Sequence, residues 1–231
     1  MKALLHSFFD LIAPRRCVVC GQRLSLSQPF ICARCRLMMP LTGFAADAYE
    51  NVMARLFWLR VPIERAAALF YYEPGSAVTQ IVKRIKYGGD RELGHYAGEM
   101  MGRELSAYGF FDGIDGIVAV PLAKKRERQR GFNQSLLLAE GIGSSTGLPV
   151  IRNAVVRTEF HKSQTQLSYS ERAENVDGVF KLTHPEALHG RHILLVDDVV
   201  TTGATCTACG NALVKAGNTK LSILSLAFTR H

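Results

Sequence analysis

Two adjacent aspartates, Asp197 and Asp198, stand between an apolar run and a loop rich in hydroxyl groups. The apolar run 193–196 predicts a buried strand, and the residues after the loop predict a helix that begins near Gly203. Carboxylates accept hydrogen bonds from sugar hydroxyls, and the unpaired N–H groups and dipole of a helix N-terminus favour phosphate. We therefore expect a sugar-phosphate site whose phosphate loop consists of Thr201, Thr202, Gly203, Ala204 and Thr205.

The alternative explanation of this stretch is an aspartate helix cap followed by threonines of a turn. A cap needs one acid and gives no reason for three threonines around a glycine. Neither G-x-G-x-x-G nor G-x-x-x-x-G-K-[ST] occurs in the chain, which excludes the dinucleotide and P-loop motifs. In a receiver domain the paired acids follow the first strand, whereas this pair precedes the last one. The sugar-phosphate interpretation is therefore favoured.

A second charged segment follows the apolar strand at 116–122 and carries Lys124, Lys125, Arg126 and Arg130. A solvated run of basic residues is the alternative explanation. However, the segment follows the end of a strand, so it lies at the same edge of the predicted sheet as the acidic pair. Ligands of open α/β sheets bind at this edge, the carboxyl ends of the strands. We expect it to bind an anion.

Four cysteines near the N-terminus have the spacing of a zinc site. The pattern is C-x2-C, eleven residues and C-x2-C, formed by Cys17, Cys20, Cys32 and Cys35. Each pair can chelate from one turn, and four thiolates complete a tetrahedron, so we expect a structural zinc ion. Cys206 and Cys209 repeat the short spacing, but they share one apolar helical face with Leu213, which favours a place in the core.

The elements that must position these groups alternate along the chain. Strands are expected at 65–74, 116–122, 148–157, 178–182, 192–196 and 220–228, and helices at 76–89, 90–105, 133–143 and 203–216. Continuous apolar strands separated by helices predict an α/β fold with an open, mostly parallel sheet covered on both faces. We divide the chain into a zinc-binding module at 1–40, a connecting helical segment at 41–65 and the α/β domain at 66–231.

The bulk composition fits this division. The chain has 231 residues, of which 48% are hydrophobic, and a formal charge of +8 that favours polyanionic partners. No apolar run approaches the ~18 residues of a membrane span. The first fourteen residues predict an amphipathic helix and not a signal peptide, so a cytoplasmic location is expected.

Two stretches resemble known families. The residues ILLVDDVVTTGAT resemble the ribosyl-pyrophosphate signature of type I phosphoribosyltransferases. This resemblance implies that Asp197 and Asp198 face the ribose hydroxyls, that the threonine loop holds the 5′-phosphate, and that phosphoribosyl pyrophosphate binds with Mg²⁺. It also implies a pyrophosphate site at the basic segment 124–130.

The residues VPL, Arg126 and RGFNQ resemble the ComF family of competence-associated, phosphoribosyltransferase-like proteins, over residues 66–231. Proteins of this family characteristically carry an N-terminal zinc finger, in agreement with the cysteine spacing. The polar stretch from Glu159 to Asp177, with Gln164, Gln166 and Arg172, is similar to a mobile hood over the active site of related enzymes.

Two hypotheses of different class follow. As an enzyme, the chain would transfer a ribosyl phosphate to an acceptor nitrogen in nucleotide salvage, with Asp197 and Asp198 as catalytic residues. As a binding module, it would bind phosphoribosyl pyrophosphate or a nucleotide and act in DNA uptake and utilisation, with single-stranded DNA or DNA-uptake proteins as partners. The resemblance favours binding, and the sequence leaves turnover open.

Overall fold

The computed structural model describes residues 14–158 and 179–230. Within them lie both charged segments and all six cysteines. The amphipathic helix expected at the N-terminus and the polar stretch from Glu159 to Asp177 lie outside the described residues.

The centre of the molecule is a four-stranded sheet in the order β1-β6-β5-β2, and every neighbouring pair is parallel. Its strands are β1 (Arg65–Tyr72), β2 (Gly116–Ala119), β5 (His192–Val200) and β6 (Lys220–Thr229). The two central strands, β5 and β6, are buried along most of their length because helices cover both faces. The predicted open, mostly parallel α/β sheet is confirmed.

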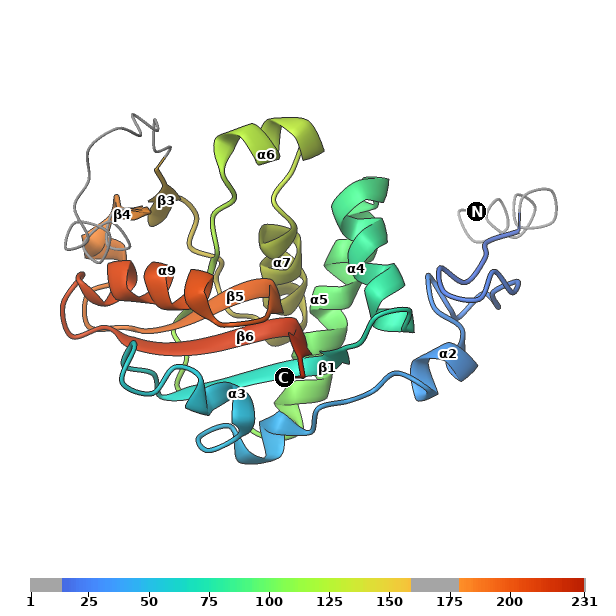
Figure 1. Cartoon of the computed structure of the whole chain (residues 1–231), viewed down its shortest axis with the longest axis horizontal. Helices are drawn as coiled ribbons and strands as arrows, with labels where there is room; N and C mark the ends of the chain where they lie inside the picture. Colours follow the sequence, from blue (N-terminus) through green and yellow to red (C-terminus); the bar gives the residue numbers. More distant parts are fainter. Residues whose placement is uncertain (1–13, 159–178, 231) are drawn as a thin grey trace.

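Helices cover the two faces of the sheet. On one face lie α5 (Arg91–Ser106) and α7 (Gln134–Thr146), with α4 (Ala77–Gly88) beside them, and α9 (Ala204–Val214) covers the other (Figure 1). Helices α5 and α7 touch at glycines. A Cβ on Gly98 would lie 2.1 Å from the carbonyl oxygen of Leu138, and one on Gly141 would lie 2.0 Å from that of His95. The two backbones therefore pack closer than larger residues would allow.

Two expected strands differ from the observed ones. The run 148–157 forms only a single bridge from Val150 to Ile117 and the short β3 (Val155–Arg157), which pairs antiparallel with β4 (Phe180–Leu182). Asn153 adopts a left-handed conformation with φ of 59°, which interrupts the run and turns the chain away from the sheet. Strand β5 continues past Val196 through the acidic pair, because β6 is long enough to pair with Val200.

Short helices complete the described chain. They are α2 (Ala33–Leu37), η1 (Phe44–Asp47), α3 (Val52–Arg55), α6 (Lys124–Arg130) and η2 (Pro185–Ala187). The connecting segment 41–65, expected to be helical, thus contains only the short helices η1 and α3. The basic segment 124–130 forms helix α6, and Figure 1 shows it projecting beyond the sheet.

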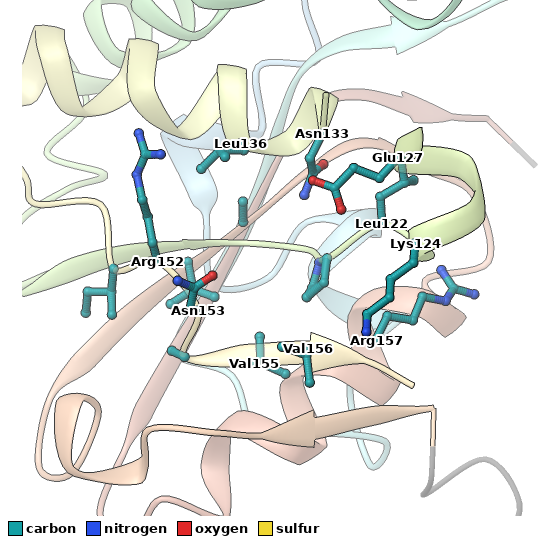
Figure 2. Close-up of a pocket in the computed structure, with 15 residues that line it drawn as sticks. Leu122, Lys124, Glu127, Asn133, Leu136, Arg152, Asn153, Val155, Val156 and Arg157 are labelled. Atoms are coloured by element: carbon teal, nitrogen blue, oxygen red, sulfur yellow. The ribbon is translucent and has the colours of Figure 1, made fainter. Parts of the chain in front are cut away.

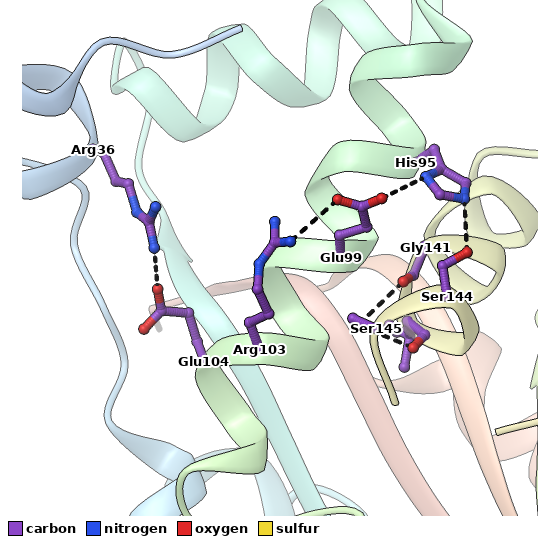
Figure 3. Close-up of polar contacts among 9 residues, drawn as sticks. Arg36, His95, Glu99, Arg103, Glu104, Gly141, Ser144 and Ser145 are labelled. Carbon is purple, nitrogen blue, oxygen red and sulfur yellow. Dashed lines mark hydrogen bonds and ion pairs between the residues drawn. The ribbon is translucent and has the colours of Figure 1, made fainter. Parts of the chain in front are cut away.

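The cysteine-bearing segment packs against α5. The Arg36 guanidinium pairs with the Glu104 carboxylate, and the rings of Phe30 and Tyr96 lie 5.3 Å apart. Figure 3 shows this ion pair beside a second network on the same helix. In that network Glu99 pairs with Arg103 and His95, and His95 Nε2 is 3.1 Å from Ser144 Oγ of α7. Helix α5 thus connects the cysteine segment to the helical layer.

Candidate functional site

The acidic pair lies at the carboxyl end of β5, where the chain turns toward α9. Asp197 Oδ1 accepts hydrogen bonds from Ser135 Oγ at 2.9 Å and from the Asp198 backbone N–H at 2.9 Å. Its other carboxylate oxygen accepts a weaker bond from Cys206 Sγ at 3.7 Å. Asp197 is therefore held between the start of α7 and the first turn of α9.

Asp198 has a different partner. Its Oδ1 lies 3.0 Å from Nζ of Lys86, near the end of α4, and both side chains are mostly buried. A charge pair that is largely removed from water needs both partners, since loss of one leaves the other uncompensated. Lys86 therefore fixes one of the two acids and brings a positive charge to the site.

The surroundings of Asp197 favour its protonated form. Burial raises the pKa of Asp197 to about 7, and the neighbouring Asp198 charge contributes to the rise. The hydrogen bonds from Asp198 N–H and Ser135, together with the Lys86 charge, lower this pKa but do not outweigh burial. Near neutral pH the carboxyl can therefore either donate or accept a hydrogen bond.

The threonine loop leads directly into α9. Gly203 is the N-cap residue of this helix, with φ of 72°, and no side chain caps the helix. A Cβ on Gly203 would lie 3.0 Å from the ring of Phe57, so the turn needs glycine for both its conformation and its packing.

The threonine loop is also held by an arginine from outside the sheet. Arg60 Nη1 donates to the Thr202 carbonyl oxygen at 2.8 Å. Thr201, Thr202, Ala204 and Thr205 are exposed, so the loop offers backbone N–H groups and hydroxyls to an anion.

The four basic residues named from the sequence do not lie together. Arg126 and Arg130 are four residues apart on α6 and line one cavity, whereas Lys124 lines another. Residues four apart share a helix face, and residues two apart do not, which explains the division. Lys125 lines neither cavity. Of the four basic residues, Arg126 and Arg130 thus share one cavity, which Lys86 also lines.

The cavity with Arg126 and Arg130 has a volume of about 570 Å³ and lies between the end of α4 and α6. Lys86 lines it and at the same time contacts Asp198. The acidic pair and this basic cavity are therefore neighbours that share one lysine.

The cavity with Lys124 is smaller, about 270 Å³, and lies between β2, the start of α7 and β3 (Figure 2). Apolar side chains such as Val118 and Val155 line it together with the amides of Asn133 and Asn153. The Asn133 Nδ2 group donates to the Val120 carbonyl oxygen at 3.0 Å, which fixes this amide. The mixture suits a small, partly polar ligand.

The four N-terminal cysteines come together as their spacing predicted. The sulfur atoms of Cys17, Cys20, Cys32 and Cys35 all lie within 4.8 Å of one another. Cys20 and Cys32 are 3.8 Å apart at sulfur, which equals the edge of about 3.8 Å expected for a tetrahedron with Zn–S bonds of about 2.3 Å. The four thiols therefore form a site that could hold zinc.

The thiol of Cys17 has an altered acidity. Burial tends to raise its pKa, but the backbone N–H groups of Cys32, Cys20 and Val19 outweigh burial and lower this pKa to about 6. The pKa of Cys35 is raised by burial and by the neighbouring thiols. A cluster that contains one easily formed thiolate is suited to recruit a metal cation.

Cys206 and Cys209 lie in the core, as expected from their helical spacing. Both are buried in α9, and burial raises the pKa of each thiol. Within the described ranges, the only cluster of metal-ligating groups is that of the four N-terminal cysteines.

Comparisons with known proteins give relatives along nearly the whole chain. The DNA utilization protein YhgH of Escherichia coli K12 is 28% identical over 229 residues, which cover 95% of this chain and 99% of that protein. Competence protein F of Haemophilus influenzae is 32% identical over 49% of this chain and 50% of its own length. Competence protein ComFC of Bacillus subtilis is 35% identical over 44% of this chain and 39% of its own length.

The chain is thus similar to DNA utilization and competence proteins, ComFC among them. No family model matches it. Among solved structures, the ComF-like chain is similar to glutamine phosphoribosylpyrophosphate amidotransferase from B. subtilis, with a TM-score of 0.42 and 20% identity over 57% of this chain. The ComF-like chain spans 26% of that structure. No helix within the described residues of the ComF-like protein has the length and apolar character to cross a membrane.

Several residues of the site were not found from the sequence. Lys86, which pairs with Asp198, was not among the residues predicted for the site. Ser135 and Arg60 carried no signal of their own, because each contacts the site from an element distant along the chain. Lys86 could have been predicted from its position in the last turn of α4, which ends at Gly88 and Gly89. A side chain in that turn can reach the edge of the sheet.

Proposed function

We propose that this ComF-like protein binds a ribose 5-phosphate ester, of the type of phosphoribosyl pyrophosphate, and acts in the use of DNA. The observation that carries the proposal is the continuity of β5, the threonine loop and the uncapped N-terminus of α9. Sugar hydroxyls and phosphate are the two groups that such a unit binds together. The names of the relatives, DNA utilization and competence proteins, support the wider role.

In this proposal each part of the site has its own task. Asp197 and Asp198 accept hydrogen bonds from the ribose hydroxyls, and the Thr201 to Thr205 loop binds the 5′-phosphate. The diphosphate lies toward the basic cavity of Lys86, Arg126 and Arg130, where positive charge offsets its own. Lys124 and Lys125 contribute long-range attraction only. Mg²⁺ would accompany the diphosphate and offset part of its negative charge.

We propose that Cys17, Cys20, Cys32 and Cys35 hold a zinc ion with a structural role. Four thiolate ligands leave no open position for a substrate or water. The ion would join the two turns that carry the cysteine pairs and keep the segment folded against α5.

The test is a thermal shift with phosphoribosyl pyrophosphate and Mg²⁺ at millimolar concentration. We expect the wild type to melt at a higher temperature with the ligand, because a ligand of the folded state stabilises it by mass action. Asp197→Asn together with Asp198→Asn should abolish the shift. Asp112→Asn, an exposed aspartate outside the site, is the matched control and should keep it.

An unchanged wild-type melting curve would overturn the proposed ligand. A shift that survives in the double variant would show that the ligand binds elsewhere on the chain.

Catalysed transfer to an acceptor is the second candidate function. The smaller cavity favours it, since the amides of Asn133 and Asn153 among apolar side chains could pair with the polar edge of a base. Pyrophosphate release in the presence of individual nucleobases measures this activity. Release that needs both a nucleobase and the intact acidic pair would establish the enzyme, and its absence with all bases would leave the binding function alone.

A further inference from the structure

The smaller cavity has apolar walls on two sides. In Figure 2 Leu136 of α7 lies on one side of it and Val155 of β3 on the other, and Val118 of β2 also lines it. Its volume of about 270 Å³ is close to the lower limit for ligand cavities, roughly 300 Å³. The cavity therefore has room for a single flat ring between two apolar surfaces.

Basic side chains outnumber acidic ones around this cavity. Three cations and one acid line it: Lys124, Arg152, Arg157 and Glu127. The Arg152 guanidinium is already paired with the Glu140 carboxylate of α7. Lys124 and Arg157 have no carboxylate within ion-pair distance among the residues that the structure describes. These two cations thus carry charge that no described side chain pairs with.

The two cations lie on the same side of the cavity. Figure 2 shows the Lys124 amine and the Arg157 side chain on the side of β3, whereas the Glu127 carboxylate lies toward Asn133. The Arg157 guanidinium is 5.4 Å from the centroid of the Phe180 ring, which holds it near the end of β3. One side of a largely apolar cavity is therefore suited to the carboxylate of a ligand.

A side-chain amide lines the same cavity. Asn153 lies in a left-handed turn with φ of 59°, and the Thr183 hydroxyl donates to its carbonyl oxygen. The backbone of Asn153 is thereby held in place. Its side-chain amide offers one donor group and one acceptor to the edge of a bound ring.

Small ligands of different chemistry would use these walls to different degrees. A neutral ring would cover the apolar side chains and meet the amide, but it would leave Lys124 and Arg157 without an anion. A free phosphate or diphosphate would use the cations and leave the apolar walls in contact with water. A ring that carries a carboxylate uses both, because burial of its faces and pairing of its charge each contribute to binding.

We propose that the smaller cavity binds a flat aromatic or heteroaromatic acid, with its ring between the apolar walls and its carboxylate paired with Lys124 and Arg157. This inference deepens the second candidate function, on which it rests for the role of the acid as acceptor. Binding of the acid requires neither transfer nor the sugar phosphate, so it can be tested by itself.

The first turn of α7 places the cavity beside the acidic pair. Asn133, the N-cap residue of this helix, lines the cavity, and Ser135 donates to Asp197 at 2.9 Å. A ring bound in the cavity is therefore next to the site proposed for the sugar phosphate, as an acceptor must be.

The experiment is isothermal titration calorimetry of the full chain at low salt with two matched pairs of probes. Orotate is compared with uracil, which is the same ring without the carboxylate, and nicotinate is compared with nicotinamide. We expect an acid to bind, and its neutral counterpart to bind about tenfold more weakly or less, the size typical of one lost hydrogen bond between charged groups.

Variants of two neighbouring lysines separate local pairing from general attraction. Lys124→Gln should weaken binding of the acid about tenfold and leave that of the neutral ring unchanged, and Lys124→Arg should restore it. Lys125→Gln is the matched control, because it removes the same charge one residue away from a side chain that does not line the cavity. Arg157→Gln should act like Lys124→Gln.

Three results would overturn the proposal. The first is absence of binding by both acids at millimolar concentration. The second is equal binding of each acid and its neutral counterpart. The third is an equal loss of acid binding in Lys124→Gln and Lys125→Gln, which would reduce the role of Lys124 to long-range attraction.

The thermal-shift test distinguishes failure of this inference from failure of the proposed function. Arg157→Gln should keep its thermal shift with phosphoribosyl pyrophosphate and Mg²⁺, since Arg157 takes no part in that site. Absence of acid binding with an intact wild-type thermal shift would reject the acid site alone. Absence of the wild-type thermal shift, with acid binding that still depends on Lys124, would reject the sugar-phosphate site alone.

Discussion

The cysteine segment and the acidic site differ in how much their polar or metal-binding side chains contribute to the buried core. In residues 14–40, three of the six buried hydrophobic side chains are cysteines of the cluster: Cys17, Leu24, Ile31, Cys32, Cys35 and Met39. In β5, by contrast, the acids follow a run of fully buried aliphatic residues, and the packing of this run does not involve the carboxylates.

This difference predicts which substitutions should unfold each region. A segment with so small a core depends on a cross-link or a metal for its fold, as small modules generally do. The α/β body depends on apolar packing, and its charged groups are tolerated at some cost, as the raised pKa of Asp197 indicates. Removing the functional groups should therefore unfold the first region and leave the second intact.

The largest effect is expected in the cysteine segment. Binding of a structural zinc ion is worth about 10 kcal/mol or more in small modules, so its loss exceeds what the few buried residues can offset. Cys17→Ser or a strong chelator should remove one zinc per chain, as measured by mass spectrometry of the native protein. Trypsin should then cut within residues 14–40 while the α/β body resists.

Cys209→Ala is the control, because it removes a cysteine outside the cluster and should keep the metal. Purified wild-type protein without zinc, and with residues 14–40 resistant to trypsin, would contradict the comparison.

An intermediate effect is expected where α5 and α7 meet. Gly98→Ala would force a methyl group against the Leu138 carbonyl oxygen and separate the helices. We expect a loss of about 3 kcal/mol in the free energy of unfolding, measured with urea, and an unchanged zinc content. In Gly88→Ala the new Cβ meets only the flexible Arg84 side chain, so this control should cost little. Equal losses in both variants would show that the close approach is not needed.

A third effect, which depends on pH, is expected at the acidic pair. Since the pKa of Asp197 is raised from 3.8 to about 7, the folded state binds more protons than the unfolded state between these values. Wild-type stability should therefore fall as pH rises from about 4 to about 7. Asp197→Asn lacks this titration and should be more stable than the wild type at pH 8, with the difference vanishing toward pH 4.

Urea unfolding at several pH values measures this dependence, with Asp112→Asn as a control that should follow the wild type. A constant difference between Asp197→Asn and the wild type at all pH values would show that titration of Asp197 plays no part.

The sequence was sufficient for features that depend on neighbours along the chain. The helical periods of α4 and α5, the apolar runs of β5 and β6 and the spacing of the four cysteines each specify local structure. Strand β3 was overestimated because the left-handed turn at Asn153 has no marker of the kind that glycine would give.

Features that depend on distant elements were missed. The pair of Lys86 with Asp198 and the contact of Arg130 with Tyr87 form only once α4 and α6 are folded against the sheet edge. The basic residues of α6 were grouped by their closeness in sequence, whereas a helix distributes them over different sides. Charge composition predicts that an anion binds but not which cations share one cavity.

The segment before β1 has a consequence for dissecting the chain. Phe57 fills the space beside Gly203, Arg60 holds the Thr202 carbonyl, and the Asn51 amide donates to the Ala66 carbonyl oxygen at 2.7 Å. A fragment that starts at Ala66 would therefore remove one wall of the threonine loop although every residue of the loop is present. A fragment that keeps the surroundings of the threonine loop should begin near Pro40, whose carbonyl oxygen accepts a hydrogen bond from the Tyr71 N–H in β1.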